Sequence, residues 1–397
     1  MGDGQKQSLL PLVENNVWIY GIGVVGKRAC TLFQYFNIQI KGILVTSMKG
    51  NISQYFGVTV TEFQNADISP DDIIVVTAVG KAQEEICKEI SSRKLNFVVC
   101  SADILCDLWK TSEFNFEDRK KNHNKLCMVL SGYKEFLWDD VFDRLSAFCP
   151  DDVDVCICSA GKYDSKLSKY SEENGWSYLS TAVNSVSLIQ NIAISLFPEA
   201  EWIYKMDEDM FITEKTFETM MTSSECFIKK QPYHFGLCSP LIPINGIGYR
   251  YILNKYELLD SYQEQFGTAF VGGNPMSEIE CNPDAAEFMW GRLPQIDELA
   301  KDAVTDSTVE ICGSRLSIGL ILFQRALWEY MQGFLVYGSM DLGIDEEDMN
   351  AFCTNNSRAM IIAHNAIAGH FGFGKQTAQM RKYYLENKGT FGRKNHG

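Results

Sequence analysis

Short apolar runs that alternate with helix-like stretches constrain the fold of this chain most strongly. Residues 17–23 (VWIYGIG), 41–46 (KGILVT) and 71–79 (DDIIVVTAV) are apolar and rich in β-branched side chains, and 81–94 (KAQEEICKEISSRK) has the spacing of an amphipathic helix. Such a strand and helix series predicts a parallel sheet covered by helices. We therefore predict an α/β fold class, with a Rossmann-like domain over residues 1–121.

A polar stretch separates this series from a second one. Residues 107–125 are charged and have no clear periodicity, which is typical of a connection between domains. Beyond them the alternation resumes, and the strand-like run 201–206 (EWIYKM) leads into an acidic triplet, residues 207–209. Because ligands of open α/β sheets bind outside the carboxyl ends of strands, the triplet stands where chemistry is expected. A second α/β domain is predicted over residues 122–397.

Charge and cysteine usage narrow the class of protein. A formal net charge of -15 argues against a nucleic-acid partner, because a phosphate backbone would be repelled, so any anionic substrate must be met by local cations or a metal. The 13 cysteines are odd in number and scattered, which favours a reducing compartment. The N-terminus lacks the pattern of a signal peptide, and no apolar run reaches bilayer length. These observations predict a cytoplasmic protein.

The acidic triplet is the first candidate site. Asp207 and Asp209, one residue apart, are suited to hold one hard divalent cation, Mn²⁺ or Mg²⁺, whose shell is completed by substrate phosphates. The alternative is a solvated acidic turn. The apolar residues on both sides of the triplet favour the metal, since a solvated turn needs no such flanks.

The run from residue 184 to residue 212 (NSVSLIQNIAISLFPEAEWIYKMDEDMFI) resembles the Asp-x-Asp region of GT-A glycosyltransferases of the bacterial surface-polysaccharide type. In that fold an Asn-bearing helix precedes the strand that ends in the motif. The resemblance covers about residues 126–380 and implies a GT-A fold for the second domain. It implies that Asp207 and Asp209 bind the metal, that Asp207 and Glu208 contact the sugar nucleotide, and that Asn184 and Asn191 lie near the donor. Helix capping and a polar helix face are the alternatives for the two asparagines.

The same resemblance assigns further donor-side roles. Tyr133 would stack on the nucleotide base and Ser159 would contact the base or ribose, although Tyr133 also suits an ordinary loop aromatic. His370, in a glycine-flanked run near the C-terminus, would be a metal ligand, and Lys375 would stabilise the departing diphosphate. A core histidine is the alternative for such a residue.

A second acidic cluster, residues 345–348, leads into a probable helix. Displacing a nucleoside diphosphate in one inverting step requires a carboxylate that takes the proton of the acceptor hydroxyl. By resemblance to the Glu-Asp motif of inverting GT-A enzymes, Asp348 is the predicted base and Glu347 the second choice, while helix capping is the alternative. Trp290 is a candidate platform for the acceptor sugar and equally a candidate core residue.

The first domain contains a motif that points to a different function. Gly21, Gly23 and Gly26 have GxGxxG spacing between a strand and a helix, an arrangement that brings backbone close to a phosphate. It predicts either an N-domain nucleotide site or a tight structural turn. The alternative function is an NAD(P)-dependent oxidoreductase or epimerase acting on a sugar nucleotide. The acid expected after the second strand for the ribose hydroxyls is missing, which counts against it.

The sequence as a whole thus predicts an inverting, metal-dependent glycosyltransferase. It would move a hexose (galactose, galactofuranose, glucose or N-acetylglucosamine) from a UDP-sugar to a hydroxyl of a surface polysaccharide or lipid-linked glycan. The basic, aromatic stretch from Lys375 onward is either a solvated helix face or a peripheral contact with the inner face of an anionic membrane.

Overall fold

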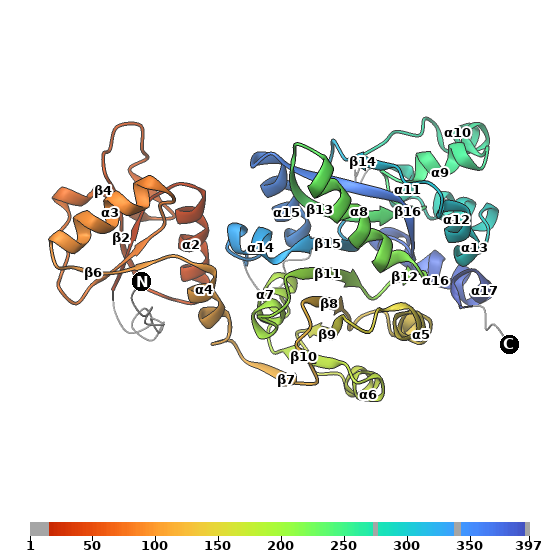
Figure 1. Ribbon diagram of the computed structural model, residues 1–397, viewed down its shortest axis with the longest axis horizontal. Coiled ribbons are helices and arrows are strands. Elements are labelled where there is room, and N and C mark those ends of the chain that lie inside the picture. The colour runs from red at the N-terminus through yellow and green to blue at the C-terminus, as the bar shows by residue number, and fades with distance from the viewer. Residues whose placement is uncertain (1–15, 273–276, 337–342, 394–397) are drawn as a thin grey trace. The chain divides into compact units, whose positions relative to one another are not determined.

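The computed structural model describes residues 16–272, 277–336 and 343–393, and it confirms the α/β class (Figure 1). By packing, the chain divides into two units. Unit 1 consists of residues 1–114, 183–195 and 328–345, and unit 2 of residues 115–182, 196–327 and 346–397. The predicted boundary between residues 121 and 122 stays a prediction.

Unit 1 holds a six-stranded sheet in the order β3-β4-β2-β1-β5-β6. Its strands are β1 (Val17–Tyr20), β2 (Ile40–Val45), β3 (Gln54–Tyr55), β4 (Val58–Glu62), β5 (Ile73–Val76) and β6 (Asn96–Val99). The pairs β1-β2, β1-β5, β2-β4 and β5-β6 are parallel, and β3 runs antiparallel to β4. The continuous apolar runs of β1 and β5 are fully buried, as expected for central strands of a parallel sheet.

Unit 2 holds a ten-stranded mixed sheet whose main path is β12-β16-β13-β15-β11-β8-β9-β10-β7, with β14 paired to β16. Its strands are β7 (Phe114–Glu117), β8 (Lys125–Leu130), β9 (Asp154–Ala160), β10 (Ser177–Thr181), β11 (Trp202–Asp207), β12 (Met210–Ile212), β13 (His234–Leu241), β14 (Val309–Ile311), β15 (Leu320–Gln324) and β16 (Arg358–His370). Strands β8 to β11 are parallel where they pair, and β15 is antiparallel to β11. The parallel half of the sheet delivers the acidic triplet.

The α-helices of unit 1 are α2 (Val24–Tyr35), α3 (Lys81–Ser92) and α4 (Ala102–Trp109), while α7 (Val186–Leu196), α14 (Arg325–Met331) and α15 (Ile344–Asn355) contain residues of both units. Those of unit 2 are α5 (Trp138–Phe148), α6 (Ser165–Asn174), α8 (Thr216–Lys230), α9 (Tyr249–Lys255), α10 (Leu259–Phe266), α11 (Glu278–Cys281), α12 (Pro283–Arg292), α13 (Ile296–Ala303), α16 (Thr377–Glu386) and α17 (Lys388–Phe391). Short 3₁₀ turns are η1 (Phe63–Asn65), η2 (Glu135–Leu137) and η3 (Gly374–Gln376). Within the described ranges, no helix combines the length and hydropathy of a bilayer span.

Two segments differ from what their patterns predict. The stretch predicted as a connection contains the end of α4 and the strand β7, which joins the edge of the second sheet. The run 320–334, which looks helical, begins as the strand β15, and only its later part forms α14. Residues 320–323 are all fully buried between β11 and β13, and a short apolar run of that kind suits a central strand as well as a buried helix.

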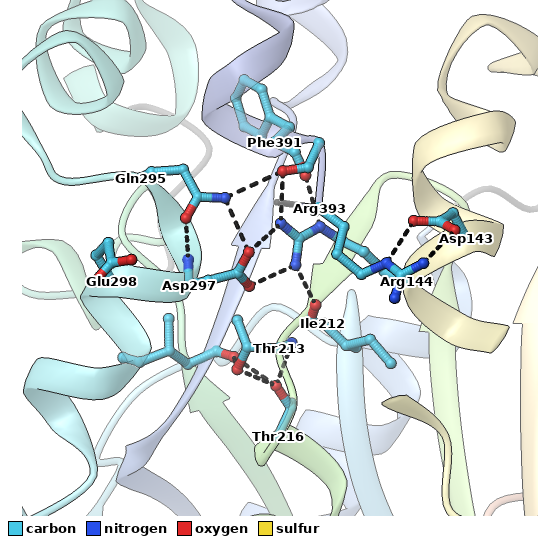
Figure 2. Close-up of polar contacts among 12 residues, drawn as sticks. Asp143, Arg144, Ile212, Thr213, Thr216, Gln295, Asp297, Glu298, Phe391 and Arg393 are labelled. Carbon is cyan, nitrogen blue, oxygen red and sulfur yellow. Dashed lines mark hydrogen bonds and ion pairs between the residues drawn. The ribbon is translucent and has the colours of Figure 1, made fainter. Parts of the chain in front are cut away.

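The buried side chain of Arg144 ties four segments of unit 2 together (Figure 2). Its guanidinium donates two hydrogen bonds to the carboxylate of Asp297, at 2.7 and 3.0 Å. It also donates to the backbone carbonyls of Ile212, Phe391 and Gly392. Burial alone would raise the pKa of Asp297, but Arg144 outweighs that effect and holds this pKa below its ordinary value. The pair therefore clamps the C-terminal segment onto α5, β12 and α13.

We expect Asp297→Asn to lower the free energy of unfolding of unit 2 by about 3 kcal/mol, because it leaves the buried guanidinium without its counter-ion. The matched control is Asp143→Asn, which removes the exposed ion pair with Arg393 and should cost less than about 1 kcal/mol. Since the pKa of Asp297 is depressed in the fold, its contribution is present at neutral pH and is lost as the pH falls through that lowered value. Equal unfolding midpoints for the two variants in denaturant titrations would contradict the clamp.

Candidate functional site

The carboxylate of Glu208 holds the loop that follows β8. Glu208 comes directly after β11, which runs parallel to β8, so the ends of the two strands lie level. Its two oxygens accept four hydrogen bonds of 2.6 to 3.0 Å, from the backbone N–H groups of Gly132, Tyr133 and Lys134 and from the indole N–H of Trp138. The side chain is 6% exposed. These bonds hold the loop in place, and a donor contact of Glu208 stays a prediction.

Asp209 lies where the loop after β8 meets the end of β16. Its Oδ2 is 3.3 Å from His370 Nε2 and forms an ion pair with Lys134 Nζ. Met210 pairs with His370 across β12 and β16, and the N–H of Phe371 donates to the Asp209 carbonyl, so backbone pairing fixes this meeting. Burial favours a higher pKa for Asp209, but the charges of His370 and Lys134 outweigh it and hold the pKa well below its usual range. Asp209 is therefore an ionised, buried carboxylate.

Lys134 is the cation on this carboxylate. Burial tends to lower the pKa of its ammonium, but the charge of Asp209 outweighs burial and raises the pKa above its ordinary value. The side chain is 26% exposed, whereas that of Asp209 is 3% exposed. Lys134 is thus the more exposed member of the pair, and its raised pKa keeps the ammonium protonated at neutral pH.

Asp207 is the most accessible acid of the triplet. Its side chain is 36% exposed, and its Oδ1 pairs with Lys205 Nζ at 2.7 Å. The same ammonium donates to the carbonyl of Ile318, and the N–H of Asp207 donates to the carbonyl of Gly319. The segment before β15 therefore supports the first acid of the triplet.

The predicted divalent cation can be compared with these contacts. Carboxylates and an imidazole are ligands that Mn²⁺ accepts. In this arrangement, however, Asp209 Oδ2 already carries an ammonium and Asp207 Oδ1 faces another. Across the described ranges, no three acidic, histidine or cysteine side chains come together as a ready metal site. The arrangement therefore does not fit a resident cation unless Lys134 moves, and we derive no step through one.

Tyr133 and Ser159, predicted to face the nucleotide base and ribose, have different environments. The ring of Tyr133 is 64% exposed, its hydroxyl donates to the carbonyl of Ala160, and Lys162 Nζ lies 5.3 Å from the ring centroid. Tyr133 is thus available for stacking. Ser159 is buried, and its hydroxyl bonds the carbonyl of Lys162 and the hydroxyl of Tyr178. Ser159 supports the turn that carries Lys162, and its contact with a donor stays a prediction.

The two asparagines of the predicted donor site belong to unit 1, whereas the triplet belongs to unit 2. Asn191 is buried, its Nδ2 donates to the carbonyl of Phe334, and its Oδ1 accepts from the N–H of Phe334 and the indole of Trp328. These bonds occupy the amide, so Asn191 joins α7 to the 328–334 segment. Asn184 precedes α7, and Ser185, not Asn184, accepts the capping bond from Leu188. A donor contact of Asn184 stays a prediction.

In the acidic cluster at the start of α15, Glu346 contacts the segment beside the triplet, whereas the sequence predicts Asp348 and Glu347 as the functional acids. Glu346 accepts from the guanidinium of Arg315 at 2.7 Å and from the N–H of Ile318 at 3.2 Å. The Ile318 carbonyl accepts from Lys205, the partner of Asp207, and the Gly319 carbonyl accepts from the N–H of Asp207. Glu346 is thus the acid of this helix that connects to the triplet. Glu347 is largely exposed and lies 3.8 Å from Arg315. Asp348 is half-buried on the helix. Asp348 and Glu347 stay predicted candidates for the base, and Glu346 is a third candidate.

Glu280 on α11 is a candidate that sequence reasoning missed. Its side chain is buried, and Oε1 accepts the N–H of Gly246 at 2.8 Å. Burial, reinforced by the charge of Glu346, raises the pKa of Glu280 to about 7 against the lowering effects of Gly246, His370 and Arg315. A carboxyl group that titrates near neutral pH suits proton transfer. No motif surrounds Glu280 in the sequence that would have singled it out.

The remaining predictions concern Lys375, Trp290 and the basic C-terminal stretch. Lys375 is exposed on η3, five residues after His370. Trp290 is buried against Phe391, so it is a core residue and cannot serve as a sugar platform in this conformation. In the basic C-terminal stretch, Arg381 lies over the ring of Phe136 and Arg393 pairs with Asp143. These cations face the chain itself, and the predicted membrane contact gains no support.

Local structure explains two of the three glycines of the GxGxxG run in unit 1. Gly21 has a φ of +117°, and a Cβ on Gly26 would stand 2.1 Å from the carbonyl oxygen of Gly21. Both are required by the tight packing of α2 on β1. A Cβ on Gly23 would meet nothing within 4 Å, and its φ of -67° suits any residue. The N-domain nucleotide site stays a prediction.

A cavity of about 460 Å³ in unit 2 lies beside the Arg144 cluster and contains no residue of the triplet. Its cations are already paired: Lys215 with Glu218, Lys301 with Glu298 and Arg393 with Asp143. These three cations are thus each engaged by an acid, as Lys134 is by Asp209.

Comparisons with known proteins leave the family open. No protein-family model matches the chain, and no curated protein matches its sequence. Among solved structures, the chain is similar to the mannosyltransferase PcManGT from Pyrobaculum calidifontis, in complex with GDP-Man and Mn²⁺. That likeness has 13% identity and a TM-score of 0.37, and it covers 70% of this chain and 67% of the other. At this level it does not by itself establish an activity.

We expect Glu208→Gln to free the loop after β8, because an amide NH₂ would face N–H donors that now bind a carboxylate. Losing charged hydrogen bonds of this kind costs about 1.5 to 3 kcal/mol. Amide hydrogen exchange at residues 132–134 should therefore speed up by about 10- to 100-fold. The control is Glu201→Gln at an exposed position, which should leave this loop unchanged. Equal exchange in both variants would contradict the positioning role of Glu208.

Proposed function

We propose that this protein is a glycosyltransferase that moves a hexose from a nucleoside diphosphate to a hydroxyl of a glycan. The proposed acceptor is a surface polysaccharide or a lipid-linked glycan, and the proposed stereochemical course is inversion. UDP is the proposed nucleotide. The second unit is proposed to have the GT-A arrangement.

One observation carries the proposal. The acidic triplet follows β11 at the carboxyl ends of parallel strands, and Glu208 locks the loop of Tyr133 and Lys134 against it. An exposed aromatic ring and an ammonium are thereby held side by side, next to the buried Asp209. A ring for a base and a cation for a phosphate are what a nucleoside diphosphate requires.

The reaction assigns work to the residues of this region. Tyr133 stacks on the base, and Lys162, from the adjacent strand end, lies beside its ring. The bond between the anomeric carbon and the diphosphate breaks, and its electron pair stays on the phosphate oxygen. The acceptor oxygen bonds to the anomeric carbon and loses its proton to a carboxylate. Mn²⁺ or Mg²⁺ on Asp207, Asp209 and His370 remains a prediction of the sequence.

The second candidate function is an oxidoreductase or epimerase that binds NAD(P) at Gly21 to Gly26. Gly23 favours it, because packing does not explain that glycine. Gly21 and Gly26, by contrast, have packing reasons of their own.

The direct test is release of nucleoside diphosphate from a panel of UDP-hexoses, UDP-N-acetylglucosamine and GDP-mannose, with water as the default acceptor. We expect turnover of at least one donor by the wild-type protein and a loss of at least tenfold in Tyr133→Ala. Tyr163→Ala is the matched control, since Tyr163 is also an exposed loop tyrosine. Binding of NAD⁺ with no turnover of any sugar nucleotide would contradict the proposal in favour of the second candidate.

The proton acceptor can be identified by comparing Asp348→Asn, Glu347→Gln, Glu346→Gln and Glu280→Gln. The base should lower the rate constant of transfer by about 10²- to 10⁴-fold while donor affinity stays nearly unchanged. If Glu280 is the base, the rate rises as the pH passes about 7, because the carboxyl group must be ionised to accept a proton. Wild-type rates in all four variants would remove a carboxylate base from the mechanism.

A further inference from the structure

The backbone of Lys134 is held by hydrogen bonds that do not involve its side chain, and the side chain extends from there to Asp209. Its N–H is bound by Glu208 Oε1 at 3.0 Å, and its two neighbours on the N-terminal side are bound by the same carboxylate. The loop therefore delivers the side chain of Lys134 to one place. Its ammonium pairs with Asp209 Oδ2, the oxygen that His370 Nε2 also approaches.

The ammonium of Lys134 has further N–H groups that can donate to a ligand. A lysine ammonium has three N–H donors, and among the described residues Asp209 is the acceptor of one of them. Asp209 itself is almost completely buried, whereas Lys134 is partly exposed. The Lys134 side chain is therefore the more accessible member of the pair, and the remaining N–H groups suit an anion with several oxygens.

A second lysine lies beside the same loop. Lys162 follows β9, its Nζ lies over the ring of Tyr133, and its side chain is 40% exposed. Gly132 leaves space for it, because a Cβ there would stand 3.1 Å from Lys162 Cε. Lys162 also pairs with Asp164 at 3.5 Å. Two lysines thus lie beside the exposed tyrosine in a protein whose net charge is -15, where an unassisted anion would be repelled.

We propose that Lys134 binds the diphosphate of the donor directly, in the place where the sequence predicts a divalent cation, and that Asp209 and His370 position its ammonium. This inference rests on the proposed function. A point charge on a rigid loop provides the same kind of stabilisation for the departing diphosphate as a metal would, and the lysine of phosphate-binding loops is a known use of this chemistry. Nucleoside diphosphates then bind without a divalent cation.

The test is calorimetric titration of the full-length protein with UDP and with GDP, each in EDTA and in Mn²⁺. We expect at least one nucleotide to bind in EDTA with an affinity within about threefold of that in Mn²⁺. Lys134→Gln should weaken this binding by about 10- to 100-fold, the size of one charge-assisted contact. Lys134→Arg keeps the charge and should retain most of the affinity, which separates a lost contact from a misfolded variant. Lys169→Gln, at an exposed lysine paired with Glu173, is the matched control and should bind as the wild type does.

The alternative outcomes are distinguishable. Binding that requires Mn²⁺ and is unchanged or tighter in Lys134→Gln would overturn the inference and leave the proposed function standing. Binding of neither nucleotide by the wild-type protein, with and without Mn²⁺, would overturn the proposed function and this inference with it.

Discussion

The buried carboxylate of Glu208 is the interaction on which the candidate site depends. A buried acidic side chain is tolerated only where hydrogen-bond donors surround it, and here three backbone N–H groups and one indole do so. The same bonds set the course of the loop after β8. Glu208 therefore determines where the exposed ring of Tyr133 and the cation of Lys134 lie.

The three acids of the triplet consequently have three different environments. Glu208 is surrounded by neutral N–H donors, Asp209 is buried beneath Lys134 and His370, and Asp207 remains partly open beside Lys205. The protein as a whole is strongly acidic, so the proposed anionic ligand would depend on this local balance of lysines against acids. The proposed chemistry draws on that balance, and the proposed role of Lys134 follows from it.

The sequence predicts part of this arrangement and not the rest, for physical reasons. An apolar strand that ends in acids is visible as a pattern, and so is a Gly-Tyr-Lys turn after another strand. That Glu208 meets this turn depends on the pairing of β11 with β8, which lies outside any local pattern. Asn191 looks like a polar helix position until Phe334 is seen to occupy its amide. Glu280 acquires its raised pKa from burial among groups that are distant in the chain.

Binding of a nucleoside diphosphate at the carboxyl ends of β8 and β11 can be tested by hydrogen-exchange footprinting of the full-length protein with UDP, GDP and NAD⁺. If it binds there, UDP or GDP should slow exchange at residues 131–135 and leave residues 20–27 unchanged. Protection of residues 20–27 by NAD⁺, with no effect of either diphosphate on the loop after β8, would contradict it.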